Sequence, residues 1–186
     1  MTTTEPTVSA DGLTLRPWRA ADAAGLTALC RASDMSTVSI EVATEADARR
    51  WLADQRRAWA TGTRLSFAVT ADAVTADAVT ADGTGEVVGQ VVLKGLAPGG
   101  TTAEVGYWTA GPQRGRGVAT RAVSALARWA FATYGANGLV RLELFHAVAN
   151  TGSCRVAEKA GFAFVRELPP HPLHDNKGHL HALTRG

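Results

Sequence analysis

The sequence has few of the features that mark exported, membrane or nucleic-acid-binding proteins. Only two of its 186 residues are cysteines, Cys30 and Cys154, which is too few for a disulfide framework. Residues 1–11 lack the apolar segment of a secretion signal, and no apolar run approaches the roughly 18 residues that cross a membrane. A net charge of +2 gives no broad basic surface for nucleic acid. We therefore expect a cytoplasmic chain with reduced thiols and neither membrane nor nucleic-acid partners.

The sequence does contain alternating strand and helix patterns across one domain. Its length and its 46% hydrophobic content suit a single core. Residues 1–12 predict a flexible tail, and residues 13–186 predict the domain. Apolar spacing indicates helices near 20–31, 44–61, 115–134 and 153–160, and strands near 13–19, 64–70, 85–96, 102–110, 139–148, 162–168 and 179–186. Thr44 and Asp47 resemble a capping box at the second helix. This order favours an α/β fold with a mixed sheet.

An internal repeat interrupts the predicted hairpin of strands 64–70 and 85–96. AVTAD occurs three times in succession, over residues 68–72, 73–77 and 78–82. A period of five residues suits neither a helix nor a strand. We interpret residues 71–84 as an expanded hairpin tip, where insertions cost little, with the first copy still in the strand. A flap that contacts the substrate is the alternative.

A glycine-rich turn between a predicted strand and a predicted helix carries the clearest chemical signal. It reads Arg-Gly-Arg-Gly-Val-Ala-Thr over residues 114–120. The first turn of a helix offers amide groups without intrahelical partners and a partial positive charge. Gly115 and Gly117 let this backbone approach a bulky anion, while Arg114 and Arg116 add charge. The pattern favours a pyrophosphate site, although in isolation it would also suit a solvated turn. It has neither the Walker lysine nor the complete dinucleotide glycine pattern.

Three motifs in order resemble the GNAT superfamily of N-acetyltransferases, in particular its RimJ/RimL-like branch. The turn over residues 114–119 is similar to the family signature Arg/Gln-x-x-Gly-x-Gly/Ala. The run Glu-Val-Gly-Tyr-Trp-Thr over residues 104–109 and the run over residues 150–162, which begins Asn-Thr-Gly-Ser, are also similar to that branch. The opening LTLRPWRAADA extends the resemblance, which covers about residues 13–168.

The resemblance implies a mostly antiparallel mixed sheet, flanked by helices and splayed between the fourth and fifth predicted strands. Acetyl-CoA is then the co-substrate. Its pantetheine arm would bind the backbone of residues 105–109 like an added strand, and its pyrophosphate would bind the turn. The implied CoA-binding residues are Val105, Tyr107, Trp108, Thr109, Arg114, Gly115, Arg116, Gly117, Val118, Ala119, Thr120, Asn150 and Ser153.

Three residues are candidates for the acid–base chemistry of acetyl transfer. Glu104 would help to deprotonate the amine, directly or through water, with Glu143 as a second candidate. A solvated or ion-paired strand residue is the alternative for Glu104. Many GNAT enzymes place a tyrosine acid seven residues after the asparagine, where this chain has Ala157. We therefore propose Ser153 as proton donor to the thiolate, although it also suits a helix N-cap.

The remaining reactive side chains favour other roles. Cys154 lies near a helix start, but no histidine partner is evident in the sequence, so we expect direct transfer rather than an acyl-cysteine. His171, His174, His179 and His181 have spacings that can bind metal, yet they suit a polar loop, and we expect no metal. A histidine in the acceptor pocket is an alternative.

The predicted function is transfer of an acetyl group from acetyl-CoA to a primary amine, either a protein N-terminal α-amine or a small molecule, in a ternary complex. A resistance-type or toxin-type acetyltransferase and a non-catalytic acyl-CoA-binding module are the alternatives. The acceptor has no readable signature. Trp51, Trp59 and Trp108 could line its pocket, but core packing suits at least two of them better. The resemblance leaves a homodimer open.

Overall fold

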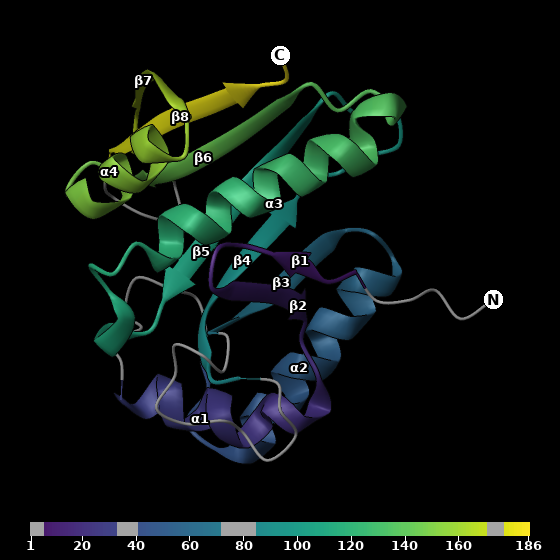
Figure 1. Cartoon of the computed structure of the whole chain (residues 1–186), viewed down its shortest axis with the longest axis vertical. Coiled ribbons are helices and arrows are strands. Elements are labelled where there is room, and N and C mark those ends of the chain that lie inside the picture. Colours follow the sequence, from purple (N-terminus) through teal and green to yellow (C-terminus); the bar gives the residue numbers. More distant parts are fainter. Residues whose placement is uncertain (1–5, 33–40, 72–84, 171–176) are drawn as a thin grey trace.

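A continuous β-sheet forms the frame of the computed structural model, which describes residues 6–32, 41–71, 85–170 and 177–186 (Figure 1). Within these residues the strands are β1 (Val8–Ser9), β2 (Leu13–Pro17), β3 (Arg64–Ala71), β4 (Val87–Lys94), β5 (Thr102–Thr109), β6 (Arg141–Ala147), β7 (Ala163–Leu168) and β8 (Gly178–Thr184). The helices are α1 (Ala23–Ala32), α2 (Glu45–Ala60), α3 (Val118–Tyr134) and α4 (Thr151–Lys159). The α/β plan is as predicted, and so is the order of the elements from β2 to β8.

The sheet splays where β5 meets β6. Its strand order is β1-β2-β3-β4-β5-β6-β8-β7, and among the described residues every neighbouring pair is antiparallel except β5 and β6. These two strands are in register only from Thr102 opposite Arg141 to Glu104 opposite Glu143. Residues 105–109 of β5 therefore continue past the point where pairing with β6 ends. This confirms the splay expected between the fourth and fifth predicted strands.

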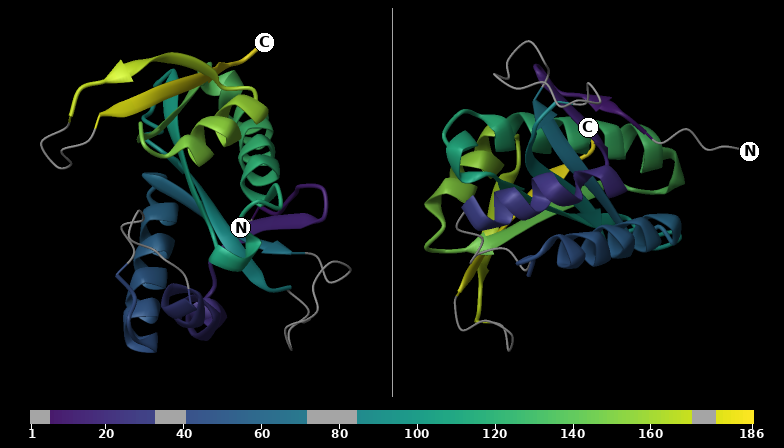
Figure 2. Two further views of the ribbon diagram at one scale, coloured as in Figure 1. Left: turned by 90° about the vertical axis from the view of Figure 1, so that its left-hand side faces the viewer. Right: turned by 90° about the horizontal axis from the view of Figure 1, so that it is seen from below.

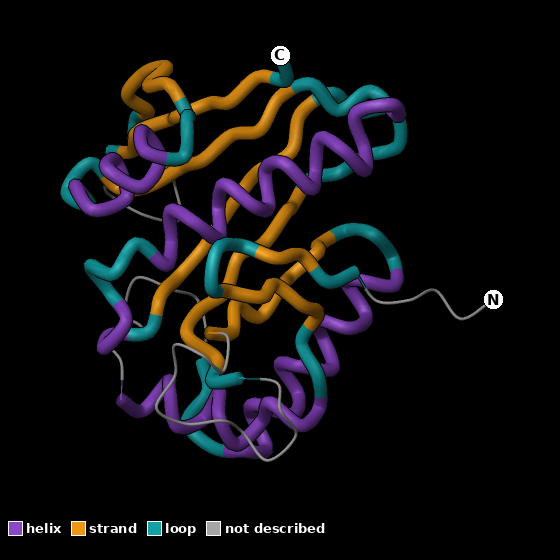
Figure 3. The backbone as a smooth tube through the Cα atoms, viewed as in Figure 1, coloured by secondary structure: helices purple, strands orange, loops and turns teal. Residues whose placement is uncertain are grey.

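Helices cover both faces of this sheet (Figures 2 and 3). On one face α3 inserts Ala122, Leu126 and Ala130 into the main core, together with Val105 of β5. On the other face α1 and α2 form a second core. Because side chains alternate along a strand, the odd-numbered residues from 103 to 109 of β5 face α3, and the even-numbered ones face α1 and α2. The two faces therefore place different residues of β5 in separate environments.

Local sequence signals account for the helix starts. Thr44 caps α2: its hydroxyl accepts from the amide of Asp47 at 3.2 Å, and the Asp47 carboxylate accepts from the amide of Thr44 at 2.8 Å. The Thr44 hydroxyl also lies 2.7 Å from the Asp47 carboxylate, and this side-chain hydrogen bond, followed by the one from the Thr44 amide, lowers the pKa of Asp47. The predicted capping box is thus confirmed. Gly117, with a left-handed φ of 74°, directly precedes α3, so residues 115–117 form a turn rather than the first helical residues expected.

Two boundaries differ from the sequence predictions, and the end of β3 agrees with them. Strand β1 lies inside the segment expected to be a flexible tail, because Val8 and Ser9 pair with β2. Helix α4 begins earlier than expected and is capped by Asn150 rather than Ser153. The first AVTAD copy continues β3 as far as Ala71, whose amide donates to Glu86 at 3.0 Å and so joins the hairpin. The rest of the repeat lies outside the described residues.

None of the helices in the described part of the chain combines the length and the apolar character that crossing a membrane requires.

Candidate active site

Two carboxylates face each other at the vertex of the splay. Glu104 and Glu143 are register partners of parallel strands, so their side chains lie on the same face of the sheet. Each pairs with a basic residue: Glu104 with Lys94 at 2.5 Å, and Glu143 with Arg141 at 2.8 Å. The Glu104 side chain keeps 37% of its surface exposed. Glu104 is therefore an ion-paired carboxylate within reach of solvent.

A hydroxyl pair occupies the opposite face of β5. The phenol of Tyr107 donates to the hydroxyl oxygen of Ser153 at 2.8 Å. Asn150 caps α4 by accepting from the Ser153 amide at 3.1 Å, which leaves the serine hydroxyl directed to β5. Burial raises the pKa of Tyr107 more than the bond to Ser153 lowers it, so the phenol stays protonated at neutral pH. The pair can pass a proton towards the gap beside β5.

The glycine-rich turn between β5 and α3 is open to a ligand. Gly115 and Gly117 have φ values of 77° and 74°, and a Cβ added at either position would meet nothing within 4 Å. Arg114 fixes the turn to the end of β5, since its Nε donates to the carbonyl of Thr109 at 3.2 Å. Residues 114–117 are exposed, whereas Val118 is buried and Ala119 and Thr120 are half-buried. First-turn amides of α3 therefore border an exposed backbone cradle that suits an anion.

Two polar atoms at the end of β5 lack partners. The hydroxyl of Thr109 and the indole nitrogen of Trp108 are buried without a hydrogen bond among the described residues. Unpaired buried polar groups are costly and often mark ligand contacts. Thr109 lies on the α3 face and Trp108 on the face of α1 and α2. The end of β5 thus offers unsatisfied hydrogen-bonding groups on both sides of the sheet.

The structure gives Cys154 the histidine partners that sequence reasoning did not find. Its sulfur lies 3.3 Å from Nδ1 of His179 and 3.8 Å from Nε2 of His181. His146 of β6 joins them, because it is the register partner of His179. Burial, followed by the two neighbouring histidines, lowers the pKa of His146. The expectation that Cys154 has no histidine nearby is therefore wrong.

The same pairing changes the interpretation of the C-terminal histidines. His179 and His181 are not part of a polar loop but lie in β8, and His181 is buried. His171 and His174 lie outside the described residues. The signal in the sequence was the alternation of His179 and His181, which puts both on one face of a strand.

The tryptophans mainly pack the two cores. Trp51 meets Trp18 edge to face at a centroid distance of 5.2 Å, and Trp18 stacks on Trp108 at 6.4 Å. Trp59 contacts Phe67 at 4.9 Å. Core packing therefore accounts for Trp59 and for most of the Trp108 surface, while Trp51 is half-buried.

Comparisons with known proteins agree with this geometry. The family model for the acetyltransferase (GNAT) domain matches residues 12–163. No curated protein sequence matches the chain significantly.

Solved structures similar to this chain include three acetyltransferases. Mycobacterium smegmatis RimJ, in complex with CoA-disulfide, has a TM-score of 0.77 and 22% identity over 97% of this chain and 86% of its own. The Salmonella typhimurium acetyltransferase that modifies the N-terminal serine of ribosomal protein L7/L12 scores 0.79 at 15% identity, with 97% and 100% covered. The microcin C7 self-immunity acetyltransferase MccE, in complex with acetyl-CoA and AMP, scores 0.76 at 17% identity, with 94% and 93% covered.

The family match covers most of the chain, and the splayed strands and the glycine-rich turn agree with it. The chain therefore belongs to the acetyltransferase (GNAT) family, as an acetyltransferase that uses acetyl-CoA.

Proposed function

We propose that this enzyme transfers the acetyl group of acetyl-CoA directly to a primary amine in a ternary complex, the amine being a protein N-terminus or a small molecule. The observation that carries the proposal is the placement of acid–base groups on both faces of the splayed strand β5. Glu104 lies on the face of α1 and α2, and the Tyr107–Ser153 pair lies on the face of α3 and α4. A thioester held in the splay would have a base on one side and a proton donor on the other.

The co-substrate would follow β5 from the turn to the vertex. The pyrophosphate would bind the amides of residues 115–120, with Arg114 and Arg116 at the rim. The pantetheine amides would pair with the backbone of Val105–Thr109 on the side where β6 has diverged. The unpartnered hydroxyl of Thr109 suits a polar group of this arm. Asn150 would border the thioester end by holding the first turn of α4 in place.

Glu104 would accept the proton of the incoming amine. The ion pair with Lys94 determines which carboxylate oxygen remains available for this. The ammonium of Lys94 lies 2.5 Å from one carboxylate oxygen and holds the side chain in place. That oxygen is already engaged, so a bridging water is the more effective route from the carboxylate to the amine. An α-amine, with a reference pKa near 8, needs less help than a lysine near 10.4. This favours N-terminal and other weakly basic amines as acceptors.

On the other face Ser153 would protonate the leaving thiolate of CoA. Its hydroxyl already accepts from Tyr107, so its own proton is free to point into the gap. As Ser153 gives up this proton, the Tyr107 phenol can replace it along the existing hydrogen bond. Tyr107, rather than Ser153 alone, is then the source of the proton. Sequence reasoning assigned only the backbone of Tyr107 to CoA.

A panel of amines tests this function. We expect turnover of acetyl-CoA, followed by thiol release, with at least one of N-terminal peptides, polyamines, amino acids and aminoglycosides. Glu104→Gln should lower kcat about 10–100-fold at neutral pH because it removes the base but keeps the shape. Lys94→Gln is the matched control, and it should leave most of the activity because it frees the carboxylate. Tight CoA binding without turnover of any amine would favour a binding module instead.

The proton relay makes a separate prediction. Tyr107→Phe should lower kcat about 10-fold or more with little change in the KM for acetyl-CoA, because it removes the proton source and not the binding surface. Steady-state kinetics at several pH values would measure this. Ser153→Ala should have a similar effect, and the double variant should be no worse than either single one. Additive losses would show that the two hydroxyls act separately.

A further inference from the structure

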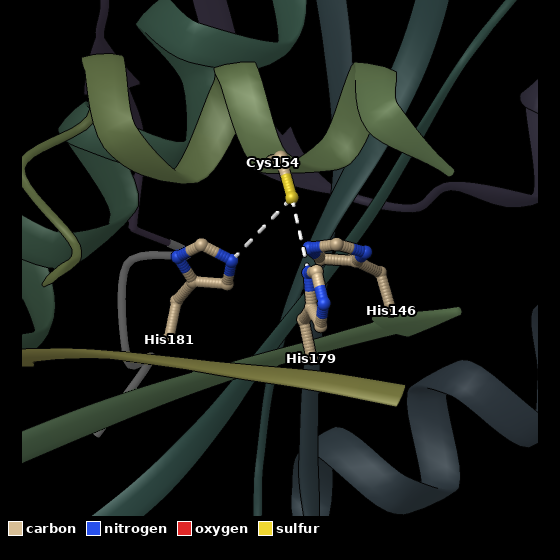
Figure 4. Close-up of side chains that lie close together, drawn as sticks. All are labelled: His146, Cys154, His179 and His181. Carbon is tan, nitrogen blue, oxygen red and sulfur yellow. Dashed lines mark hydrogen bonds between the residues drawn. The ribbon is translucent and has the colours of Figure 1, made fainter. Parts of the chain in front are cut away.

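We propose that His146, Cys154, His179 and His181 form a zinc site that joins α4 to β6 and β8. One ligand atom from each of these residues lies within 4.8 Å of every other. Figure 4 shows their side chains converging from three elements, with the cysteine above and the histidines below it. One thiolate and three imidazoles are a ligand set typical of Zn²⁺, which takes four nitrogen or sulfur ligands in a tetrahedron.

The distances need little adjustment for a tetrahedral ion. Bonds of about 2.3 Å to sulfur and about 2.0–2.1 Å to nitrogen place S···N pairs about 3.6 Å apart and N···N pairs about 3.3 Å apart. The sulfur of Cys154 lies 3.3 Å from Nδ1 of His179 and 3.8 Å from Nε2 of His181. These two distances bracket the S···N separation of about 3.6 Å that a tetrahedral ion requires. The widest separation of 4.8 Å would have to shorten by about 1.2–1.5 Å. Rotation of half-buried side chains can supply a movement of this size.

The surroundings of His146 leave one of its ring nitrogens available as a metal ligand. Nδ1 of His146 lies 2.9 Å from the carbonyl of Ala147. A ring that donates from Nδ1 to a carbonyl presents the lone pair of its other nitrogen, as metal-bound histidines do. Nε2 of His146 is buried and has no partner among the described residues. The geometry therefore fixes one histidine in the tautomer that a metal requires.

Packing also argues for a ligand rather than for a simple polar contact. His181 is 1% exposed, and among the described residues its ring makes a hydrogen-bonding contact only with Cys154, a weak one at 3.8 Å. His146 stacks on His181 with centroids 5.2 Å apart, and Phe164 covers the edges of His179 and His181. His179 meets the rings of His146 and His181 edge to face, and two ring nitrogens of the cluster are buried without a hydrogen bond among the described residues. Burial of a polar atom without a hydrogen bond is unfavourable. A catalytic cysteine–histidine dyad would need only one of the three histidines.

The fold explains why these residues meet. His146, His179 and His181 alternate with apolar residues on β6 and β8, which pair antiparallel, so all three point to the face covered by α4. Cys154 lies in the first turns of α4 and turns its sulfur to this face. A bound ion would tie α4 to the sheet one residue from Ser153. It would thus stabilise the half of the sheet beyond the splay.

Cobalt titration tests the site directly. Chelator-stripped, reduced protein should bind one Co²⁺ per chain, with intense visible bands of a tetrahedral ion and a near-ultraviolet thiolate charge-transfer band. Zn²⁺ should displace both. Saturating Zn²⁺ should raise the melting temperature by about 5–10 °C.

The two cysteines of the chain supply matched variants. Cys154→Ser should lose the thiolate band and the Zn²⁺-dependent rise in melting temperature. Cys30→Ser should keep both, since Cys30 lies in α1 and packs against the second core. His179→Ala, at a half-buried position, should weaken Co²⁺ binding at least about 10-fold and serves if Cys154→Ser does not fold. A wild-type chain without the thiolate band, or a band that survives in Cys154→Ser, would overturn the site.

Discussion

Gly117→Trp should weaken CoA binding at least about 100-fold, as measured by calorimetric titration. Gly117 has a left-handed φ of 74°, and open space surrounds the position of its missing Cβ. An indole there would occupy the volume in which we propose that the pyrophosphate meets the first turn of α3. Each hydrogen bond to a charged group contributes about 1.5–3 kcal/mol, so the loss of two such bonds gives this factor or more.

Two control variants separate the steric block from backbone strain. Gly117→Ala introduces the left-handed penalty of about 1–2 kcal/mol without the bulk, so it should destabilise the fold but retain most CoA binding. Gly62→Trp places the same ring at another open glycine, with a φ of 69° at the end of α2, and should leave CoA affinity unchanged. If Gly117→Trp binds CoA as the wild type does, the pyrophosphate does not lie on this turn.

The sequence was sufficient for the parts of the site that are local in the chain. Each of these signals depends on a few residues that are close in sequence. They are the glycine-rich turn, the capping box at Thr44 and the alternation of side chains along residues 102–109. Because these motifs occur in a characteristic order, their resemblance to one family also indicated the splay between β5 and β6. The register of that splay then placed Glu104 opposite Glu143, on one face of the sheet.

What the sequence could not predict depends on contacts between distant segments. Lys94 pairs with Glu104 because β4 and β5 are in register, and Tyr107 reaches Ser153 only because α4 packs beside β5. The histidine cluster needs the pairing of β6 with β8, which brings His146 next to His179 across 33 residues of sequence. Periodicity shows which face a side chain takes, but not which strand becomes its neighbour.

Asp22→Ala should lower the free energy of unfolding by about 3–5 kcal/mol, measured by denaturant unfolding. Asp22 accepts two hydrogen bonds from Arg16, at 2.9 Å and 2.7 Å, and both side chains are buried. Its carboxylate also accepts from the amide of Arg19 at 2.7 Å, which starts the turn that leads into α1. Removal of the acid leaves a buried guanidinium without its counter-charge. The loss of one partner of a buried ion pair destabilises a fold more than the replacement of both by apolar residues.

The matched control is Asp54→Ala, which removes an acid paired with Arg57 on the exposed side of α2. Water screens that pair, so the free energy of unfolding should hardly change. Replacing both buried partners, as in Arg16→Met with Asp22→Leu, should recover much of the loss, because no unpaired charge remains. If Asp22→Ala were as mild as Asp54→Ala, water would have to reach Arg16 in the folded chain. The entry to α1 would then be looser than the buried pair implies.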